Sequence, residues 1–214
     1  MILLGMMSEQ KKVKVLGIAG SRRRGGNTDV LLSEVLKGAA SRGAEVKTLV
    51  LSSMKFSPCT HCDGCLKTGL CIVKDEMQGI YTDFEQADVI VLATPIQFAG
   101  MTADLKAMMD RFQSRWVRKY LLKVPPLGEK KPLKGFLISV GGRKIADLFE
   151  PTLVMVKTFF RILDITYAGD LLVTGVDEKG AILKHPDVIK QAFEAGEKLV
   201  EPADKSVVQS SPSP

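Results

Sequence analysis

The feature that most restricts the fold of this 214-residue chain is its alternation of short apolar runs with amphipathic stretches. Apolar runs predict five strands, and apolar residues at helical spacing predict five helices. Parallel strands need a crossover about the length of a helix, so this alternation is typical of an α/β protein with a doubly wound parallel sheet. The predicted strands are 13–19, 45–51, 88–93, 135–140 and 164–173, and the predicted helices are 28–41, 77–86, 102–120, 151–163 and 186–200.

Length and composition fit one domain of this kind. Apolar residues make up 45% of the chain, an ordinary share for a globular protein. We predict a flexible N-terminus at 1–12, a flavodoxin-like five-stranded domain at 13–201, and a disordered Ser/Pro-rich tail at 202–214. No apolar run is long enough to cross a bilayer and no export signal is apparent. We therefore expect a cytoplasmic protein without a membrane partner.

The net charge of +6 is too small to predict nucleic-acid binding, and we expect no such partner. Within 102–120, helical spacing places Arg111, Arg115, Arg118 and Lys119 on or near one face. That face is either simply solvated or a dock for an acidic electron carrier such as ferredoxin, or for a nucleotide phosphate. The same helix carries an apolar stripe, expected in the core or at a dimer contact: Leu105, Met108, Met109, Phe112 and Trp116.

The chain has only four cysteines, and they form one compact run: Cys59, Cys62, Cys65 and Cys71. The spacing is C-x2-C-x2-C-x5-C, and the run lies in the loop after the second predicted strand. A loop this tight can direct four thiolates to one point but cannot brace distant parts of a fold. This pattern favours a four-iron cluster, in which each iron takes one cysteine thiolate.

Other roles for these cysteines remain open. Structural zinc sites usually divide their ligands into two pairs with a long separation, which this run lacks. A C-x-x-C pair with redox-active thiols or a disulfide would leave two further cysteines beside it. His61 lies within the run, but four cysteines already complete a site, so we expect His61 to face solvent or to support the ligands from outside.

The turn after the first strand, at 20–28, has the composition of a phosphate site. Ser21 and Thr28 carry hydroxyls, Asn27 an amide and Arg23 a positive charge. The following helix adds free N–H groups and the positive end of its dipole, which suits a terminal phosphate monoester. The turn lacks the Gly-Lys-Ser/Thr of a P-loop and the glycine spacing of a dinucleotide fingerprint. A solvated basic turn is the alternative.

Two further loops leave the same predicted edge of the sheet, where ligands bind in doubly wound folds. The loop at 94–101 combines an apolar platform with exposed backbone N–H groups, which suits a planar ring with polar edges. The loop at 139–143 has two glycines that let a ligand approach the backbone closely. The residues expected at the ring are Thr94, Pro95, Ile96, Gln97, Phe98, Ala99, Gly100, Gly141 and Gly142.

These motifs carry a resemblance to a known family. The turn at 20–28 and the segment at 94–111 resemble the FMN-phosphate and flavin-ring loops of the NADPH-dependent FMN reductase family. The cysteine run followed by 75–77 is similar to that of its iron–sulfur flavoprotein branch. The resemblance implies FMN at the sheet edge and one 4Fe-4S cluster held by the four cysteines. It also implies a homodimer or homotetramer in which cluster and flavin approach one another across subunits.

The leading functional hypothesis is an FMN-dependent oxidoreductase that couples two-electron flavin chemistry to one-electron cluster transfer. Since the cofactors carry the chemistry, we expect no catalytic acid–base residue. NAD(P)H is a candidate donor. One alternative is an NAD(P)H-dependent FMN or quinone reductase with a structural cysteine site. Others are a non-catalytic redox carrier or sensor, and a zinc-stabilised binding module without flavin.

Overall fold

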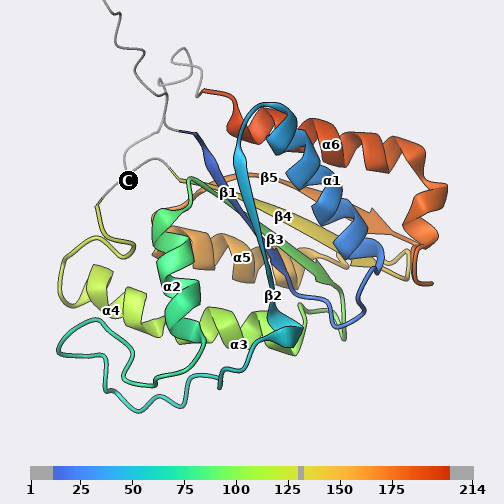
Figure 1. Cartoon of the computed structure of the whole chain (residues 1–214). Helices are drawn as coiled ribbons and strands as arrows, with labels where there is room; N and C mark the ends of the chain where they lie inside the picture. The colour runs from blue at the N-terminus through green and yellow to red at the C-terminus, as the bar shows by residue number, and fades with distance from the viewer. Residues whose placement is uncertain (1–11, 130–132, 203–214) are drawn as a thin grey trace, which may run out of the picture.

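A five-stranded parallel sheet forms the centre of the computed structural model, which describes residues 12–129 and 133–202 (Figure 1). The strand order is β2-β1-β3-β4-β5, and every neighbouring pair is parallel. This order confirms the predicted flavodoxin-like sheet. The strands are β1 (Lys14–Ala19), β2 (Glu45–Val50), β3 (Val89–Pro95), β4 (Lys134–Gly141) and β5 (Thr166–Thr174).

Helices cover both faces of this sheet and enclose two apolar cores (Figure 1). Helices α1 (Asn27–Ser41) and α6 (Pro186–Val200) cover one face. The other face carries α2 (Met77–Gln86), α3 (Ala103–Arg111), α4 (Gln113–Tyr120) and α5 (Glu150–Ile162). Two short 3₁₀ turns complete the elements, η1 (Leu51–Ser53) and η2 (Ala181–Lys184).

The central strands are apolar because both of their faces are covered. From Val89 to Thr94 every residue of β3 is buried, as is every residue of β4 after Lys134. Strand β2 lies at the edge of the sheet, and its first four residues are exposed. The continuous apolar runs in the sequence therefore mark the middle of the sheet.

The segment 102–120 forms two helices, so the prediction of a single helix there is wrong. The break falls at Phe112, whose ψ of 5° leaves the α-helical range. There the backbone makes shorter-range bonds: Phe112 N–H donates to Met109 O, and Arg115 N–H donates to Phe112 O. The Phe112 ring packs against the rings of Phe84 and Phe159 at centroid distances of 4.7 and 5.2 Å. The predicted apolar stripe is core at its first four positions and half-buried at Trp116.

Helices α1 and α6 touch backbone to backbone through two glycines. A Cβ added at Gly38 would lie 1.9 Å from the carbonyl oxygen of Phe193, and one at Gly196 would lie 1.9 Å from that of Val35. Any larger residue at either position must push the helices apart. This contact fixes α1, whose first turn borders the predicted phosphate loop.

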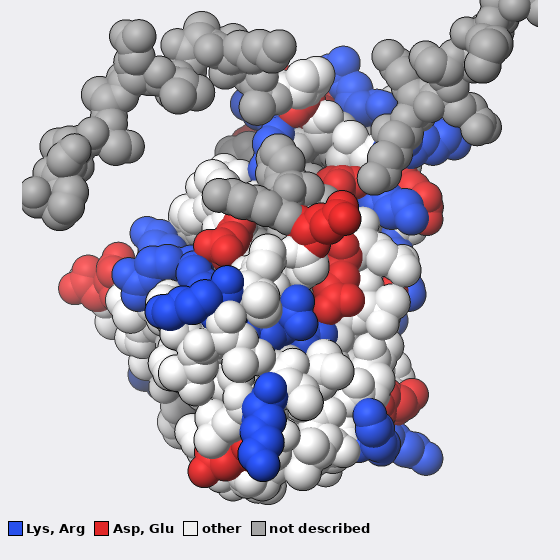
Figure 2. Space-filling model, turned by 90° about the vertical axis from the view of Figure 1, so that its left-hand side faces the viewer, with Lys and Arg blue, Asp and Glu red and all other residues white. Residues whose placement is uncertain are grey.

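The surface and the chain ends bear on the remaining predictions. On the face shown in Figure 2, several Lys and Arg side chains form one patch at the left with acidic groups beside it, and the others are separated by wide uncharged areas. No helix in the described part of the chain is long and apolar enough to cross a membrane. The predicted flexible N-terminus and disordered tail fall almost entirely on 1–11 and 203–214, outside the described residues.

Candidate functional site

A cavity of about 460 Å³ opens at the carboxyl edge of the sheet, where the three predicted loops meet. Loops after β1, β3 and β4 all contribute to it, as expected for a doubly wound sheet. A fourth loop, after β5, also contributes, although it was not predicted from the sequence. The lining residues are Ser21, Arg22, Arg23, Gly26, Asn27, Thr28, Pro95, Ile96, Gln97, Val140, Gly142, Val176 and Asp177.

The turn between β1 and α1 presents the start of a helix to this cavity. Gly25 has a φ of +64°, a conformation that favours glycine, and a Cβ at Gly26 would lie 2.7 Å from the carbonyl oxygen of Arg23. No side chain caps α1, so the N–H groups of its first turn are left for a ligand. Ser21 and Thr28 line the cavity beside them. The arrangement suits an anion.

Two predicted phosphate residues, Arg23 and Asn27, are held by the loop after β5. The Arg23 guanidinium donates to the carbonyl oxygen of Asp177 at 2.8 Å. The Asn27 amide donates to the carbonyl oxygen of Glu178 at 2.9 Å and accepts from Ile182 N–H at 3.2 Å. These side chains join the two loops as well as lining the cavity. Two features of the sequence could have predicted that this loop joins the site: it follows the fifth strand, and it begins with Gly175.

The loop after β3 turns back at a tight hairpin whose central residues are strained. Gln97 and Gly100 exchange both backbone hydrogen bonds, at 2.8 and 3.0 Å. Between them, Phe98 and Ala99 have φ values of 48° and 62°, a region that non-glycine residues rarely occupy. The Phe98 side chain is fully exposed. Such strain is typical of ligand-binding loops.

Hydrogen bonds from neighbouring strands fix the base of this hairpin. Thr94 is buried, its hydroxyl accepts from Thr102 N–H at 3.1 Å, and its carbonyl accepts from the Ser139 hydroxyl at 3.0 Å. Ile96 N–H donates to Val140 O at 2.9 Å. Of the predicted ring residues, Pro95, Ile96, Gln97 and Gly142 line the cavity. Thr94, Phe98, Ala99, Gly100 and Gly141 are not among the lining residues.

Replacing Ala99 with glycine is expected to stabilise the protein. Glycine occupies a positive φ without the steric cost that alanine has there, and this gain outweighs its greater freedom in the unfolded chain. We expect the free energy of unfolding, measured by urea denaturation of the metal-free protein, to rise by about 1 kcal/mol. Ala107→Gly, in the right-handed backbone of α3, should lower it by about 1 kcal/mol. If both substitutions lowered the free energy of unfolding, the backbone at Ala99 would not be strained.

The four cysteines lie in the long loop between η1 and α2, which runs beneath α3 and α4 in Figure 1. All four are free thiols; Cys62 is exposed and the others are half-buried. Burial raises the pKa of Cys65, and the charges of Cys71, Cys59 and Cys62 raise it further, so the thiols are near enough to interact. His61 is exposed, in line with one of the roles expected for it.

As a donor set, the four thiols fit an iron–sulfur cluster in number, type and spacing. They are not gathered at one point, however. Within residues 12–129 and 133–202, no three His, Cys, Asp or Glu side chains are arranged to hold a metal ion. The residues therefore fit a cluster by their chemistry, and closing the site requires rearrangement of the loop.

A buried ion pair holds both ends of this loop. Asp75 accepts from the backbone N–H groups of Ser57 and Met77, each at 3.1 Å, and so joins the segment before the cysteines to the segment after them. Arg111, at the end of α3, donates to both carboxylate oxygens of Asp75, at 2.7 and 3.1 Å. Burial raises the pKa of Asp75, but Arg111 and the two N–H groups outweigh it and hold that pKa below its usual value.

The predicted basic face of the 102–120 segment is wrong in its main members. Arg111 and Arg115 are only 2% and 4% exposed, because both point inward to the cysteine loop and its surroundings. Arg115 donates to Gly69 O at 3.2 Å and to the Glu85 carboxylate at 2.7 Å. Helical periodicity alone does not separate a solvated arginine from a buried one that has found partners.

Helix α3 connects the cysteine loop with the border of the carboxyl-edge cavity. Near its start, Asp104 pairs with Arg22 of the 20–28 turn through two bonds of 2.7 Å. At its end lies Arg111. The nine-residue helix is about 13.5 Å long at 1.5 Å per residue, so a single rigid element extends from one candidate site to the other.

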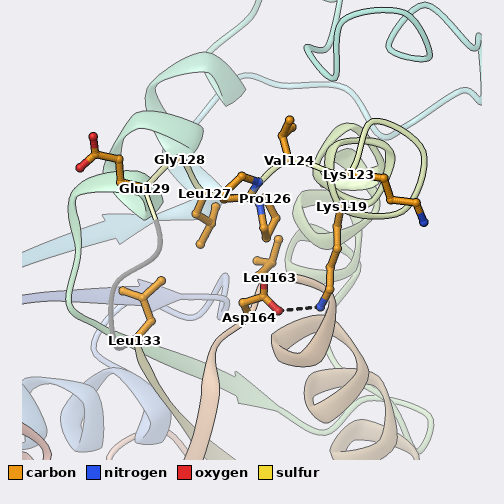
Figure 3. A pocket seen from close by; sticks show the side chains of 11 residues that line it. Lys119, Lys123, Val124, Pro126, Leu127, Gly128, Glu129, Leu133, Leu163 and Asp164 are labelled. Carbon is orange, nitrogen blue, oxygen red and sulfur yellow. Dashed lines mark hydrogen bonds and ion pairs between the residues drawn. The ribbon is translucent and has the colours of Figure 1, made fainter.

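Several other cavities lie in the described part of the chain, and two of them border α4, away from this edge. A groove of about 480 Å³ between α3–α4 and α5 includes Cys59, His61 and Trp116. A cavity of about 330 Å³, shown in Figure 3, lies at the opposite end of the sheet, before β4 and β5. The Lys119–Asp164 ion pair of 2.7 Å closes one side of that cavity. Its position at the amino ends of the strands separates it from the site described above.

Comparison with known proteins agrees with this arrangement. Residues 13–147 match the model of the NADPH-dependent FMN reductase family. An iron–sulfur flavoprotein of Methanocaldococcus jannaschii is 32% identical over 197 residues, covering 88% of this chain and 96% of the relative. One of Methanosarcina thermophila is 30% identical over 158 residues, 74% of this chain and 78% of that protein.

Solved structures show the same fold. An NAD(P)H:quinone oxidoreductase from Methanothermobacter marburgensis superposes with a TM-score of 0.68 at 17% identity, over 90% of this chain and 98% of that one. A flavone reductase gives 0.66 at 24% identity, over 88% and 62%. These two likenesses concern the fold, whereas the match over 13–147 and the archaeal relatives identify the family. The chain belongs to the NADPH-dependent FMN reductases, a family of flavin-dependent oxidoreductases, and within it to the iron–sulfur flavoprotein branch.

Proposed function

We propose that the protein binds FMN in the carboxyl-edge cavity. The phosphate lies at the start of α1 with Ser21 and Thr28, where first-turn N–H groups and the helix dipole favour an anion. The ring lies against the 95–97 segment and Gly142. Arg23 and Asn27 hold the 176–182 loop against the phosphate turn and line the site from there. The family match and the meeting of four loops at this edge support the assignment.

We further propose that the four cysteines bind a 4Fe-4S cluster and that the protein couples two-electron to one-electron transfer. When bound, FMN exchanges electrons in pairs and the cluster passes them singly. The polypeptide supplies four thiols, holds the ends of their loop with Arg111 and Asp75, and spans the two sites with α3. That link between the cysteine loop and the carboxyl-edge cavity is the observation that carries the proposal.

The first test is the anaerobic absorbance spectrum of the purified protein, with iron, sulfide, zinc and FMN assays on the same sample. We expect flavin bands on a broad visible absorbance that bleaches with dithionite, and about four irons and one FMN per chain. FMN without iron would favour a plain NAD(P)H-dependent FMN or quinone reductase. Zinc without FMN would refute both proposals. Cofactors without turnover with any donor and acceptor would indicate a redox carrier or sensor.

Thr28→Val is expected to weaken FMN binding. The change keeps the shape of the side chain but removes a hydroxyl that lines the cavity at the start of α1. A hydrogen bond to a charged group contributes about 1.5–3 kcal/mol, so the dissociation constant should rise roughly tenfold to a hundredfold. Flavin fluorescence titration measures it. The control, Ser33→Ala, alters an exposed hydroxyl further along α1 and should bind FMN normally. Equal affinity in all three proteins would place the phosphate elsewhere.

The partners also remain proposals. A homodimer or homotetramer, NAD(P)H as donor, and an acidic carrier such as ferredoxin follow from the family rather than from contacts in this chain. A cytoplasmic location accords with four reduced thiols.

With Arg111 and Arg115 buried, a docking surface for an acidic carrier must rely on other basic groups. If it exists, the rate of electron exchange with ferredoxin should fall steeply as salt rises from low to physiological ionic strength. A rate independent of salt would remove the idea.

A further inference from the structure

Arg111 is the largest fully buried side chain among the described residues, and most of its contacts lie in the cysteine loop. Its guanidinium donates to the carbonyl oxygen of Ser57 at 2.7 Å, and to that of Val73 at 3.4 Å. It also donates to the Asp75 carboxylate and, from Nη2, to the sulfur of Cys71 at 3.4 Å. One side chain thus contacts the loop before its first cysteine, after its last, and at a thiol itself.

The charge of this group is fixed. An arginine guanidinium stays protonated in proteins, and this one has the Asp75 carboxylate beside it at 2.7 Å. A permanent cation, only 2% exposed, therefore lies against one of the four cysteine sulfurs. Asp75, which pairs with the same guanidinium, is the anion that partly balances it.

We propose that Arg111 is a positioning residue that sets the reduction potential of the cluster, through its N–H contact with the Cys71 sulfur and its buried positive charge. This inference rests on the proposed function, since it needs a cluster on these cysteines. N–H donors to ligand sulfurs and nearby charge are recognised ways by which a protein tunes such a centre. No residue other than Arg111 donates a side-chain hydrogen bond to a cysteine sulfur among the contacts of the described chain.

The expected direction follows from electrostatics. Reduction adds one negative charge to a group that already carries four thiolates. A fixed cation at Cys71 stabilises the reduced form and raises the potential, whereas the Asp75 carboxylate destabilises it and lowers the potential. Removing the cation and removing the anion must therefore shift the potential in opposite directions. Loosening of the loop alone has no reason to give opposite signs.

A matched control exists in Arg115, one helical turn further along. It is equally buried, pairs with Glu85, and also contacts the cysteine loop, through the carbonyl oxygen of Gly69. Among the hydrogen bonds of the described residues, none joins Arg115 to a sulfur atom. Arg115→Lys should therefore disturb loop packing about as much as Arg111→Lys does, and leave the potential unchanged.

The test is a dithionite titration of the reconstituted holoprotein, followed by electron paramagnetic resonance, for the wild type and for Arg111→Gln, Arg111→Lys, Asp75→Asn and Arg115→Lys. We expect Arg111→Gln to lower the potential, Arg111→Lys to lower it less, and Asp75→Asn to raise it. A wild-type potential in both Arg111→Lys and Asp75→Asn, or shifts of the same sign, would overturn the proposal. If Arg111→Gln fails to retain iron, the directions in which Asp75→Asn and Arg111→Lys shift the reduction potential still test the proposal. A wild type without iron would refute the proposed function instead.

The role of Arg111 in holding the cysteine loop can also be tested in protein that lacks the cluster. Trypsin cleavage after Lys67 and Lys74, both exposed in the loop, reports how firmly its ends are held in the metal-free protein. We expect Arg111→Gln to be cleaved several-fold faster than the wild type, because the loop loses its contacts at Ser57, Val73 and Asp75 together. Cleavage at the wild-type rate would show that Arg111 does not position the loop. This readout is independent of iron and of turnover.

Discussion

Replacing Cys62 with alanine is expected to abolish the cluster absorbance and reduce iron and sulfide from about four per chain to near zero. Each iron of a four-iron cluster takes one thiolate, and the chain has no fifth cysteine to substitute. FMN binding should persist, because no cysteine lines the carboxyl-edge cavity. Cys62 is also the one exposed thiol, so its removal leaves the packing of the fold largely unchanged. Iron, sulfide and FMN assays on anaerobically reconstituted protein measure all three quantities.

The matched control is His61→Ala. This residue precedes Cys62 in the same loop, is exposed, and carries a side chain that can also bind a metal. If cysteines alone hold the cluster, iron and sulfide remain at wild-type levels in His61→Ala and disappear in Cys62→Ala. The reverse pattern, or a full cluster in both variants, would refute the four-cysteine assignment. Loss of zinc rather than iron from Cys62→Ala would establish the alternative of a structural zinc site.

The sheet could be predicted because burial leaves a direct record in the sequence. A strand covered on both faces must be apolar at every position, and the sequence of 89–93 is apolar throughout. Helix α6 was predicted at its observed bounds, since Pro186 suits a first helical turn and the apolar spacing continues to Val200. The break at Phe112 left no such mark. It contains neither glycine nor proline, and it coincides with an aromatic cluster in which Phe112 packs against rings from α2 and α5.

The candidate site was predictable where it depends on topology and unpredictable where it depends on individual partners. Carboxyl ends of parallel strands share one edge, so the loops after β1, β3 and β4 had to meet there. The loop after β5 obeys the same rule but lacks a distinctive composition. The roles of Arg23 and Asn27 in holding that loop depend on backbone carbonyls, which carry no signature in the sequence.

Arg111 shows the same limit most clearly. Its position on a helix with other basic residues predicted a solvated face, and the structure buries it. Burying an arginine is costly unless its hydrogen bonds are satisfied, and the cysteine loop supplies two carbonyls, a carboxylate and a sulfur to the two Nη atoms. Among the described residues Nε has no partner. Those acceptors lie 36 to 54 residues away in sequence. Only the folded loop brings them together.

Gly38→Ala is expected to lower the free energy of unfolding by about 3 kcal/mol. The new Cβ would lie 1.9 Å from the carbonyl oxygen of Phe193, a backbone atom that cannot move unless α6 moves with it. Alanine is the better helix former by about 0.5–1 kcal/mol, so the measured loss is what remains after that gain. Because α1 begins at the proposed phosphate turn and its neighbour α6 follows the 176–182 loop, FMN affinity should fall as well. Urea denaturation and flavin titration measure the two effects.

Gly79→Ala separates helix packing from helix propensity. Gly79 lies near the start of α2, is exposed, and has no atom within 4 Å of an added Cβ. The same chemical change should therefore stabilise the protein there by about 0.5–1 kcal/mol, and leave FMN affinity unchanged. If Gly38→Ala also proved neutral or stabilising, α1 and α6 would have to lie further apart than the glycine contact requires. If instead Gly38→Ala lowers the free energy of unfolding and Gly79→Ala raises it, the close contact between α1 and α6 stabilises the fold. A loss of FMN affinity in Gly38→Ala alone would show that this contact also holds the start of α1, and with it the phosphate turn, in place.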